Sequence, residues 1–282
     1  MSCQYLYIGM KDNKHIDGKI IAQQNEELML YWLFRFGGLS TRELTAILWP
    51  DAKDLQMSQR TIRRLLAKNF VLKRPIFTGG NIYVISEGGA RYLRKCGYSN
   101  ISSRGHRDLN FNKPTHRIIS NNFLINWHQE ISKNNPEHSF WTEFEIQRRV
   151  APFPLIKISN KEKIPDGIIQ VGNWINWIEV ENSYKGPHEI QRLMETADHF
   201  FNRNTPFYFH HKDKEYKVDG LDFVLPDQKT FRRIANALIK HNLNTNTLKK
   251  VHLYLIDISP SLVWNRILGI YDGLSVAEKL RS

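Results

Sequence analysis

Three acidic side chains are spaced so that one β-hairpin would bring them together. Residues 164–171 and 174–181 read as two β-strands joined by a two-residue Gly-Asn turn, which is a strong hairpin signal. A turn this tight fixes the register and pairs Asp166 with Glu179. Because side chains alternate between the faces of a strand, Glu181 lies on the same face as these two residues. The sequence therefore predicts a cluster of three carboxylates.

Such a cluster needs a cation, because like charges about 5 Å apart on a strand pair repel each other. Hard divalent ions such as Mg²⁺ or Mn²⁺ prefer oxygen ligands. We therefore predict a Mg²⁺ or Mn²⁺ site with Asp166, Glu179 and Glu181 as ligands. The structural alternative is a solvated strand face. The rest of that face is mostly apolar, with Ile168 opposite Trp177, which favours a site at the rim of a core.

Composition points to a polyanionic partner. The chain has 282 residues, enough for one large or two ordinary domains, and 41% of them are hydrophobic. Its net charge of +12 favours nucleic acid as the partner. The sequence shows no apolar run near the length of a membrane span, no signal-peptide pattern and only two cysteines. We expect a cytoplasmic protein without membrane insertion.

The first third of the chain predicts a winged helix. Ser40-Thr41-Arg42-Glu43 is a capping box that opens a short helix, and Ser58 is expected to cap the next one. Two strands joined through Thr78-Gly79-Gly80 would form the wing. The expected helices cover 26–36, 41–48, 59–69 and 86–96, and the expected strands cover 71–77 and 81–85.

One helix of this region carries a basic stripe behind an apolar face. Ile62 and Leu65 fall on one side of the segment 59–69, and four basic residues fall on the other. Between Gly38 and Arg107 the chain has 13 Lys and Arg against 4 Asp and Glu, so DNA binding is favoured over a merely solvated face. The predicted DNA-binding residues are Arg60, Arg63, Arg64, Lys68, Lys73 and Arg74.

The rest of the chain predicts an α/β domain. A helix is expected over 115–131, a strand over 138–146 and then the two hairpin strands, followed by helices over 187–202 and 229–241 and strands over 207–210 and 251–258. This order indicates a mixed β-sheet flanked by helices. We divide the chain into an uncertain N-terminal arm (1–22), the winged helix (23–97), a linker (98–114) and this second domain (115–282).

At these residues the sequence resembles a known family. A helix, then Pro-Asp, then Glu-x-Glu on the next strand is similar to the PD-(D/E)xK restriction-endonuclease-like fold. The full layout resembles the replication-relaxation family, and within it the MobC-type plasmid mobilisation relaxases, over roughly residues 25–202. The motifs that carry this resemblance are Tyr83-Val84-Ile85-Ser86-Glu87-Gly88-Gly89-Ala90, His116 with Asn121-Asn122, Trp141-Thr142-Glu143, Pro165-Asp166-Gly167 and Glu179-Val180-Glu181.

The resemblance implies metal-dependent cleavage of DNA, with nicking at a plasmid transfer origin. Asp166 and Glu179 match the metal-binding carboxylates of that fold, whereas Glu181 stands where many members carry Lys. Lys185 could replace that lysine from the start of the next helix, with a plain surface lysine as the alternative. Glu143 would serve as a further ligand or base, and His116 matches a helix position of the relaxase-like members. Tyr184 is taken as structural.

Other functions remain open on the sequence alone. A non-catalytic winged-helix regulator of plasmid replication or transcription is the main alternative, and the missing motif lysine supports it. A transposase-like or defence nuclease would share the chemistry and differ in its DNA target. The expected partners are a double-stranded target site, a single strand after nicking, relaxosome or coupling proteins, and a second copy of the chain, for which no interface is identified.

Overall fold

The computed structural model divides the chain into two compact units, which are described separately below. The first comprises residues 1–111 and 129–136, and the second comprises 112–128 and 137–282. The described residues are 17–76, 80–102, 104–106, 114–135, 137–153, 156–158, 161–182, 186–202, 207–211, 214–241, 243–258 and 265–276. Within them, no helix is long and apolar enough to cross a membrane.

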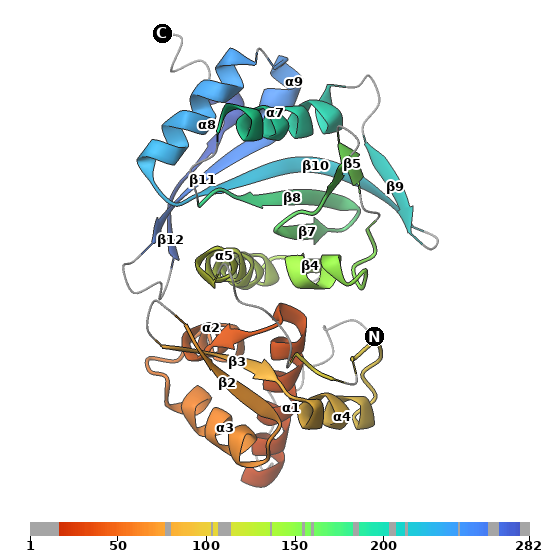
Figure 1. Ribbon diagram of the computed structural model, residues 1–282, viewed down its shortest axis with the longest axis vertical. Coiled ribbons are helices and arrows are strands. Elements are labelled where there is room, and N and C mark those ends of the chain that lie inside the picture. Colours follow the sequence, from red (N-terminus) through yellow and green to blue (C-terminus); the bar gives the residue numbers. More distant parts are fainter. Residues whose placement is uncertain are drawn as a thin grey trace. The chain divides into compact units, whose positions relative to one another are not determined.

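In its described residues, the first unit combines four helices with a small antiparallel sheet (Figure 1). Its helices are α1 (Gly18–Phe36), α2 (Thr41–Leu48), α3 (Gln56–Ala67) and α4 (Glu87–Lys95). Its strands are β1 (Leu39–Ser40), β2 (Val71–Pro75) and β3 (Asn81–Ile85), and β3 lies in the middle. Side chains from both kinds of element, such as Leu33, Leu65 and Val84, are fully buried and form the core.

The sequence predicts two side-chain caps for the helix starts of this unit, and one of them is present. The capping box predicted at α2 is present, because Ser40 Oγ accepts the Glu43 N–H and Glu43 accepts the Ser40 N–H. The predicted cap at Ser58 is wrong, since α3 begins two residues earlier, at Gln56. Ser58 is instead buried, with its hydroxyl 2.6 Å from that of Thr45 on α2.

The second unit is built on a mixed β-sheet. Along the sheet the strand order is β12-β11-β10-β8-β7-β4, and β9 also pairs with β10. Strands β8, β10 and β11 are parallel, whereas the other neighbours are antiparallel. The strands are β4 (His138–Thr142), β7 (Gly167–Val171), β8 (Trp174–Val180), β9 (Tyr208–His211), β10 (Lys214–Leu225), β11 (Val251–Ile258) and β12 (Asn265–Asp272). A separate two-stranded sheet contains β5 (Ile156–Ile158) and β6 (Lys161–Lys163).

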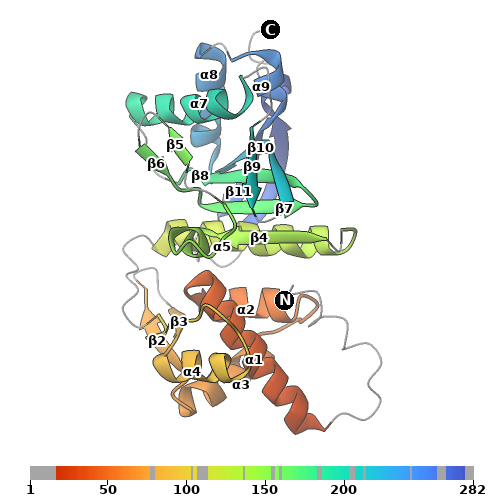
Figure 2. The same ribbon diagram turned by 90° about the vertical axis from the view of Figure 1, so that its right-hand side faces the viewer.

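Helices cover both faces of the large sheet. α7 (Pro187–Phe201), α8 (Gln228–Lys240) and the short α9 (Thr245–Lys249) lie on one face, and α5 (Pro114–Ser132) lies on the other, as Figure 1 and Figure 2 show. The main core forms under α7 and α8, where Phe200 and Ile234 pack with Trp177 of β8. On the other face, Phe123 of α5 meets Tyr254 of β11 edge to face.

The hairpin of β7 and β8 has the register predicted from its turn. Ile168 pairs with Trp177 and Gln170 pairs with Ile175, so the sequence prediction is confirmed. Gly172 takes a φ of 57°, the left-handed backbone that a two-residue hairpin turn demands. The strands are shorter than expected, and Asp166 stands just before β7, where its N–H donates to the Ile178 carbonyl.

Elements of the second unit also differ from the sequence prediction. The strand expected over 138–146 ends at Thr142, because Thr142 and Glu145 form a capping box that starts a short helix, α6 (Glu143–Gln147). Glu143 therefore lies at a helix start and not on a strand. The long central strand β10 has no counterpart among the predicted elements, although it joins the two halves of the sheet.

A polar network crosses the three parallel strands on the α5 side. Asp222 of β10 is fully buried, and the Asn176 side chain on β8 donates to both of its carboxylate oxygens. His252 Nδ1 on β11 lies 2.7 Å from Asp222 Oδ1. The hydrogen bond to Asp222 is the main reason that the pKa of His252 is raised. The buried charge of Asp222 is thus hydrogen-bonded on both sides.

Candidate metal centre

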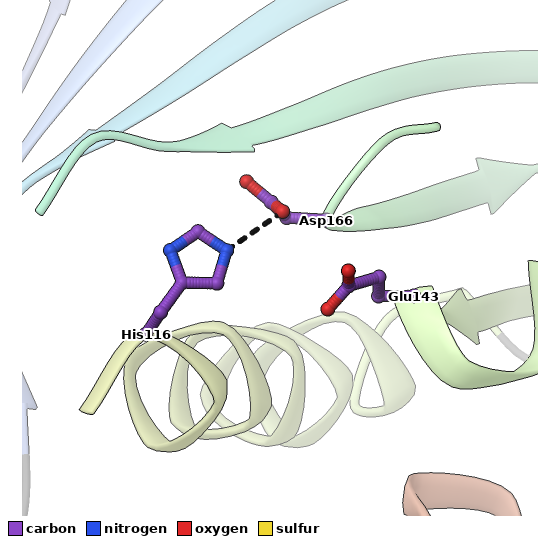
Figure 3. A group of neighbouring side chains, drawn as sticks. All are labelled: His116, Glu143 and Asp166. Atoms are coloured by element: carbon purple, nitrogen blue, oxygen red, sulfur yellow. Dashed lines mark hydrogen bonds and ion pairs between the residues drawn. The ribbon is translucent and has the colours of Figure 1, made fainter. Parts of the chain in front are cut away.

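The site begins with an ion pair between a helix and the start of a strand. His116, in the first turn of α5, places Nε2 2.8 Å from Asp166 Oδ1. Figure 3 shows the two side chains pointing toward each other. Asp166 is held in place on three sides: its Oδ2 accepts the Val180 N–H, its carbonyl accepts the Ser120 hydroxyl, and its N–H is bonded to Ile178.

A glycine allows this close approach of helix and strand. A Cβ atom added to Gly167 would stand 3.0 Å from the side chain of Leu124 on α5, a closer approach than in nine of ten real Cβ contacts. Each residue of the Asp166-Gly167 pair therefore has its own structural role. Asp166 supplies the charge, and Gly167 lets α5 lie near enough for His116 to reach it.

Asn182 sets the orientation of the imidazole. Its Oδ1 lies 3.1 Å from His116 Nδ1 and accepts a hydrogen bond from that nitrogen. This bond leaves Nε2 facing Asp166, either with a proton or with a lone pair that a metal ion can take. A second hydrogen bond of this kind typically orients the ligand histidines of metal sites.

Glu143 completes a group of three metal-ligand side chains. One donor atom from each of His116, Glu143 and Asp166 lies within 4.8 Å of the other two, which is close enough for a single ion. In Figure 3, Glu143 comes from the start of α6 and turns its carboxylate toward Asp166. Burial raises the pKa of Glu143, and the charge of Asp166 raises it further. A cation between the two carboxylates would relieve that repulsion.

The remaining predicted carboxylates lie beside this group in a different setting. Glu179 is almost fully buried, and its two oxygens accept hydrogen bonds from Lys163 Nζ (2.8 Å) and Trp177 Nε1 (2.6 Å). Burial raises the pKa of Glu179, Lys163 opposes this effect, and the charge of Asp166 adds to it. Glu181 is buried next to the same lysine, whose pKa its charge helps to raise.

The structure thus brings Asp166 together with His116 and Glu143, and it places Glu179 and Glu181 around Lys163. Lys163 was not singled out in the sequence, because β6 is three residues long and shows no pattern. Its position three residues before Asp166 is the one signal that could have pointed to it. Lys185, predicted to replace the motif lysine, and Tyr184 lie outside the described residues.

The ion pair predicts an unusual titration for His116. Burial disfavours the imidazolium, but the hydrogen bond to Asp166 and its charge outweigh that effect and raise the pKa to about 9. In the metal-free protein we expect NMR of the ring nitrogens to show His116 protonated at pH 8. Asp166→Asn removes the main cause of the upward shift and should lower the pKa of His116 clearly, because only Asn182 and Glu143 then oppose the effect of burial. A value near 9 in that variant would contradict the assignment.

The basic helix of the first unit divides into two sets of side chains. Arg64 Nε and Lys68 Nζ both contact the carboxylate of Glu26 on α1, at 2.9 and 2.6 Å. The Glu26 side chain is only 6% exposed, so these two cations neutralise a buried charge. Arg60 and Arg63 are exposed on the remaining face of α3.

The other two predicted DNA-binding residues lie on β2. Lys73 and Arg74 line a surface pocket of about 490 Å³ between β2 and the start of α4. The other residues that line it are Asn69, Leu72, Ser86, Glu87 and Gly88. All six predicted DNA-binding residues therefore belong to the first unit, but they occupy three different settings.

Comparison with known proteins adds no assignment. No protein-family model, no curated protein and no solved structure matches the chain. The case for a function therefore rests on the site itself.

Proposed function

We propose that the protein is a metal-dependent DNA endonuclease that nicks one strand, of the relaxase type expected for plasmid mobilisation. The convergence of His116, Glu143 and Asp166 beside a buried Glu179–Lys163 pair is the observation that carries the proposal. Gathering these five ionisable groups in one place costs stability, and such clusters concentrate at functional sites.

The two units support this reading through their architecture. Helices α1 to α3 followed by the β2–β3 hairpin form the element order of a winged helix, which presents a basic helix to DNA. The mixed sheet of the second unit, with helices on both faces and carboxylates gathered near the start of β7 and the end of β8, fits a restriction-endonuclease-like core.

The donor set suits Mn²⁺ and, with less preference, Mg²⁺. Carboxylates bind both ions, whereas an imidazole is a better ligand for transition metals. His116, Glu143 and Asp166 would hold the ion, which would polarise the scissile phosphate and lower the pKa of an attacking water. Asn182 would keep His116 Nδ1 protonated so that Nε2 faces the ion.

Lys163 has a separate role in this proposal. Its ammonium group neutralises Glu179 and lies close enough to Asp166 and Glu181 for their charges to raise its pKa. A fixed cation at that place would stabilise negative charge that develops on a phosphate bound beside the metal ion. It would thereby supply the charge that the Glu-x-Glu motif lacks.

Supercoiled plasmid incubated with the protein and Mn²⁺ or Mg²⁺ tests the proposal. We expect conversion to open circles that depends on the metal ion and stops with chelator. The native plasmid, where its source is known, is the preferred substrate. No nicking of cognate DNA with either ion, together with tight binding, would overturn the endonuclease assignment.

One observation favours a second candidate function. Both oxygens of Glu179 already accept hydrogen bonds, so this carboxylate is committed to Lys163 and Trp177. In a DNA-binding regulator that keeps a nuclease-like second unit as a scaffold, we expect this carboxylate to be fully hydrogen-bonded within the protein. Binding without cleavage in the plasmid assay supports that function.

DNA binding by the first unit gives a prediction at single residues. Arg60→Ala and Arg63→Ala should each weaken DNA binding and reduce the salt dependence by about one phosphate contact. Arg64→Ala should instead lower the thermal midpoint, because Glu26 loses one of its two cations. Fluorescence anisotropy at several salt concentrations, with melting curves for each variant, separates the two effects. An Arg64→Ala protein that melts normally but binds DNA as weakly as Arg60→Ala would contradict the structural role assigned to Arg64.

A further inference from the structure

Two exposed aromatic side chains and a half-buried lysine form a row across the large sheet, at the end away from the carboxylates of the candidate metal centre. Trp174 of β8 pairs with Lys217 of β10, and Lys217 pairs with Tyr208 of β9. Directly paired residues share one face of a sheet, so the three side chains form a row with the lysine in the middle. We call these three residues the Trp174–Lys217–Tyr208 row.

The row faces away from the main core. The residues next to its members, Ile175, Val218 and Phe209, all belong to the buried cluster under α7 and α8. Because side chains alternate along each strand, the row points to the opposite face, the one on which α5 lies. Trp174 remains 49% exposed and Tyr208 43% exposed, which is unusual for large aromatic side chains that have a core available one residue away.

The central cation is held against one of the aromatic rings. Lys217 Nζ lies 4.4 Å from the centre of the Trp174 ring, a cation–π contact. Among the described residues, Lys217 forms no ion pair with a carboxylate, and the nearby Glu215 pairs with His210. The row therefore offers two aromatic faces with one positive charge between them.

This combination fits a single DNA strand. Unpaired bases stack on aromatic side chains whatever their sequence, and a basic group between two stacking sites contacts the connecting phosphate. Neighbouring strands are about 4.8 Å apart, so Trp174 and Tyr208 lie roughly 10 Å from each other, room for two bases with Lys217 between them. The net charge of +12 provides the long-range attraction for a polyanion.

The location of the row connects it with the candidate metal centre. Trp174 and Val180 lie at opposite ends of the same strand, six residues or about 20 Å apart, and the Val180 N–H donates to Asp166 of the metal centre. That span corresponds to about six nucleotides at ~3.4 Å each, and to fewer in an extended strand. We propose that the Trp174–Lys217–Tyr208 row binds unpaired bases of the strand that the metal centre cuts. The role in cutting rests on the proposed function, whereas the binding of single strands does not.

Binding of fluorescein-labelled dT12 in the presence of EDTA tests the row without any cleavage. Trp174→Ala and Tyr208→Ala should each weaken binding about five- to hundredfold, the range for loss of one stacked base. Trp174→Phe should retain most of the affinity because it keeps a stacking face. Lys217→Gln should lower the salt dependence by about one phosphate contact. Tyr271→Leu is the matched control, since Tyr271 is 41% exposed on β12, at the far edge of the sheet.

A local readout separates the row from the first unit, which also binds DNA in our proposal. Stacking on Trp174 quenches its fluorescence, so dT12 should quench the wild-type protein, which has seven tryptophans, more than Trp174→Phe. Equal quenching in both proteins, or affinities of Trp174→Ala and Tyr208→Ala within twofold of wild type, would overturn the proposal. So would an equal loss in Tyr271→Leu. These results are independent of plasmid nicking, which tests the metal centre alone.

Discussion

Asp166→Asn is expected to abolish metal-dependent nicking of plasmid DNA while leaving DNA binding intact. The substitution preserves the shape of the side chain, and the amide oxygen can still accept the Val180 N–H. It removes the negative charge shared by His116 and the metal ion. Changes outside the direct ligands of metal sites already cost 10- to 100-fold. Loss of a direct ligand should therefore exceed about a hundredfold.

Two measurements check this expectation. The first is the nicking rate in Mn²⁺, compared with Asp198→Asn, which makes the same change at an exposed position on α7. The second is metal-induced stabilisation, which should reach about 2.7 kcal/mol in the wild-type protein at a hundred times the dissociation constant. It should vanish in Asp166→Asn. Nicking within twofold of wild type in Asp166→Asn would place the chemistry elsewhere.

Lys163→Met should produce the largest loss of stability among the site variants. The Glu179 side chain is only 4% exposed, and its partner Lys163 is 28% exposed, so the substitution leaves a buried carboxylate without its cation. Removing one member of a buried ion pair typically costs about 3–5 kcal/mol. Denaturant unfolding near pH 8 measures the loss, and Lys157→Met, at an exposed position on the neighbouring strand β5, is the control.

The loss should depend on pH in a defined direction. Burial holds the pKa of Glu179 above its ordinary value of 4.5, and removal of Lys163 raises it further. A folded state with the higher pKa binds more protons than the unfolded state, so stability falls as pH rises above 4.5. The penalty of Lys163→Met should therefore shrink toward pH 5 and grow toward pH 8. The double variant Lys163→Met/Glu179→Gln should recover most of it. A penalty that is constant with pH would contradict this account.

Local signals made the hairpin and parts of the first unit predictable. The Gly172-Asn173 turn fixed the pairing of Ile168 with Trp177 because a two-residue turn leaves one register. The strand β3 and the capping box at Ser40 also follow from neighbouring residues. Each of these features depends on hydrogen bonds within a few residues, which a sequence displays directly.

Features that depend on distant contacts were not predictable in the same way. Strand β10 carries Asp219, Gly220 and Asp222, residues that disfavour strands, and it is stabilised by β8 and β11 on either side. Glu143 was expected on a strand, but the capping box of α6 placed it at a helix start. The contact between Lys163 and Glu179 joins two strands that belong to different sheets, so no spacing rule reveals it.

The buried Asp222 has a consequence for how the chain avoids misfolding. Leu221 and Phe223, its neighbours in sequence, belong to the core under α7 and α8. A slip of β10 by one residue would turn Asp222 into that apolar layer and turn the two large side chains into the polar network on the α5 side. In the native alignment alone, Asn176 and His252 stand ready to bond the carboxylate. The network thus disfavours a shifted register of β10, and Asp222→Leu would permit shifted strand pairings that the native sequence penalises.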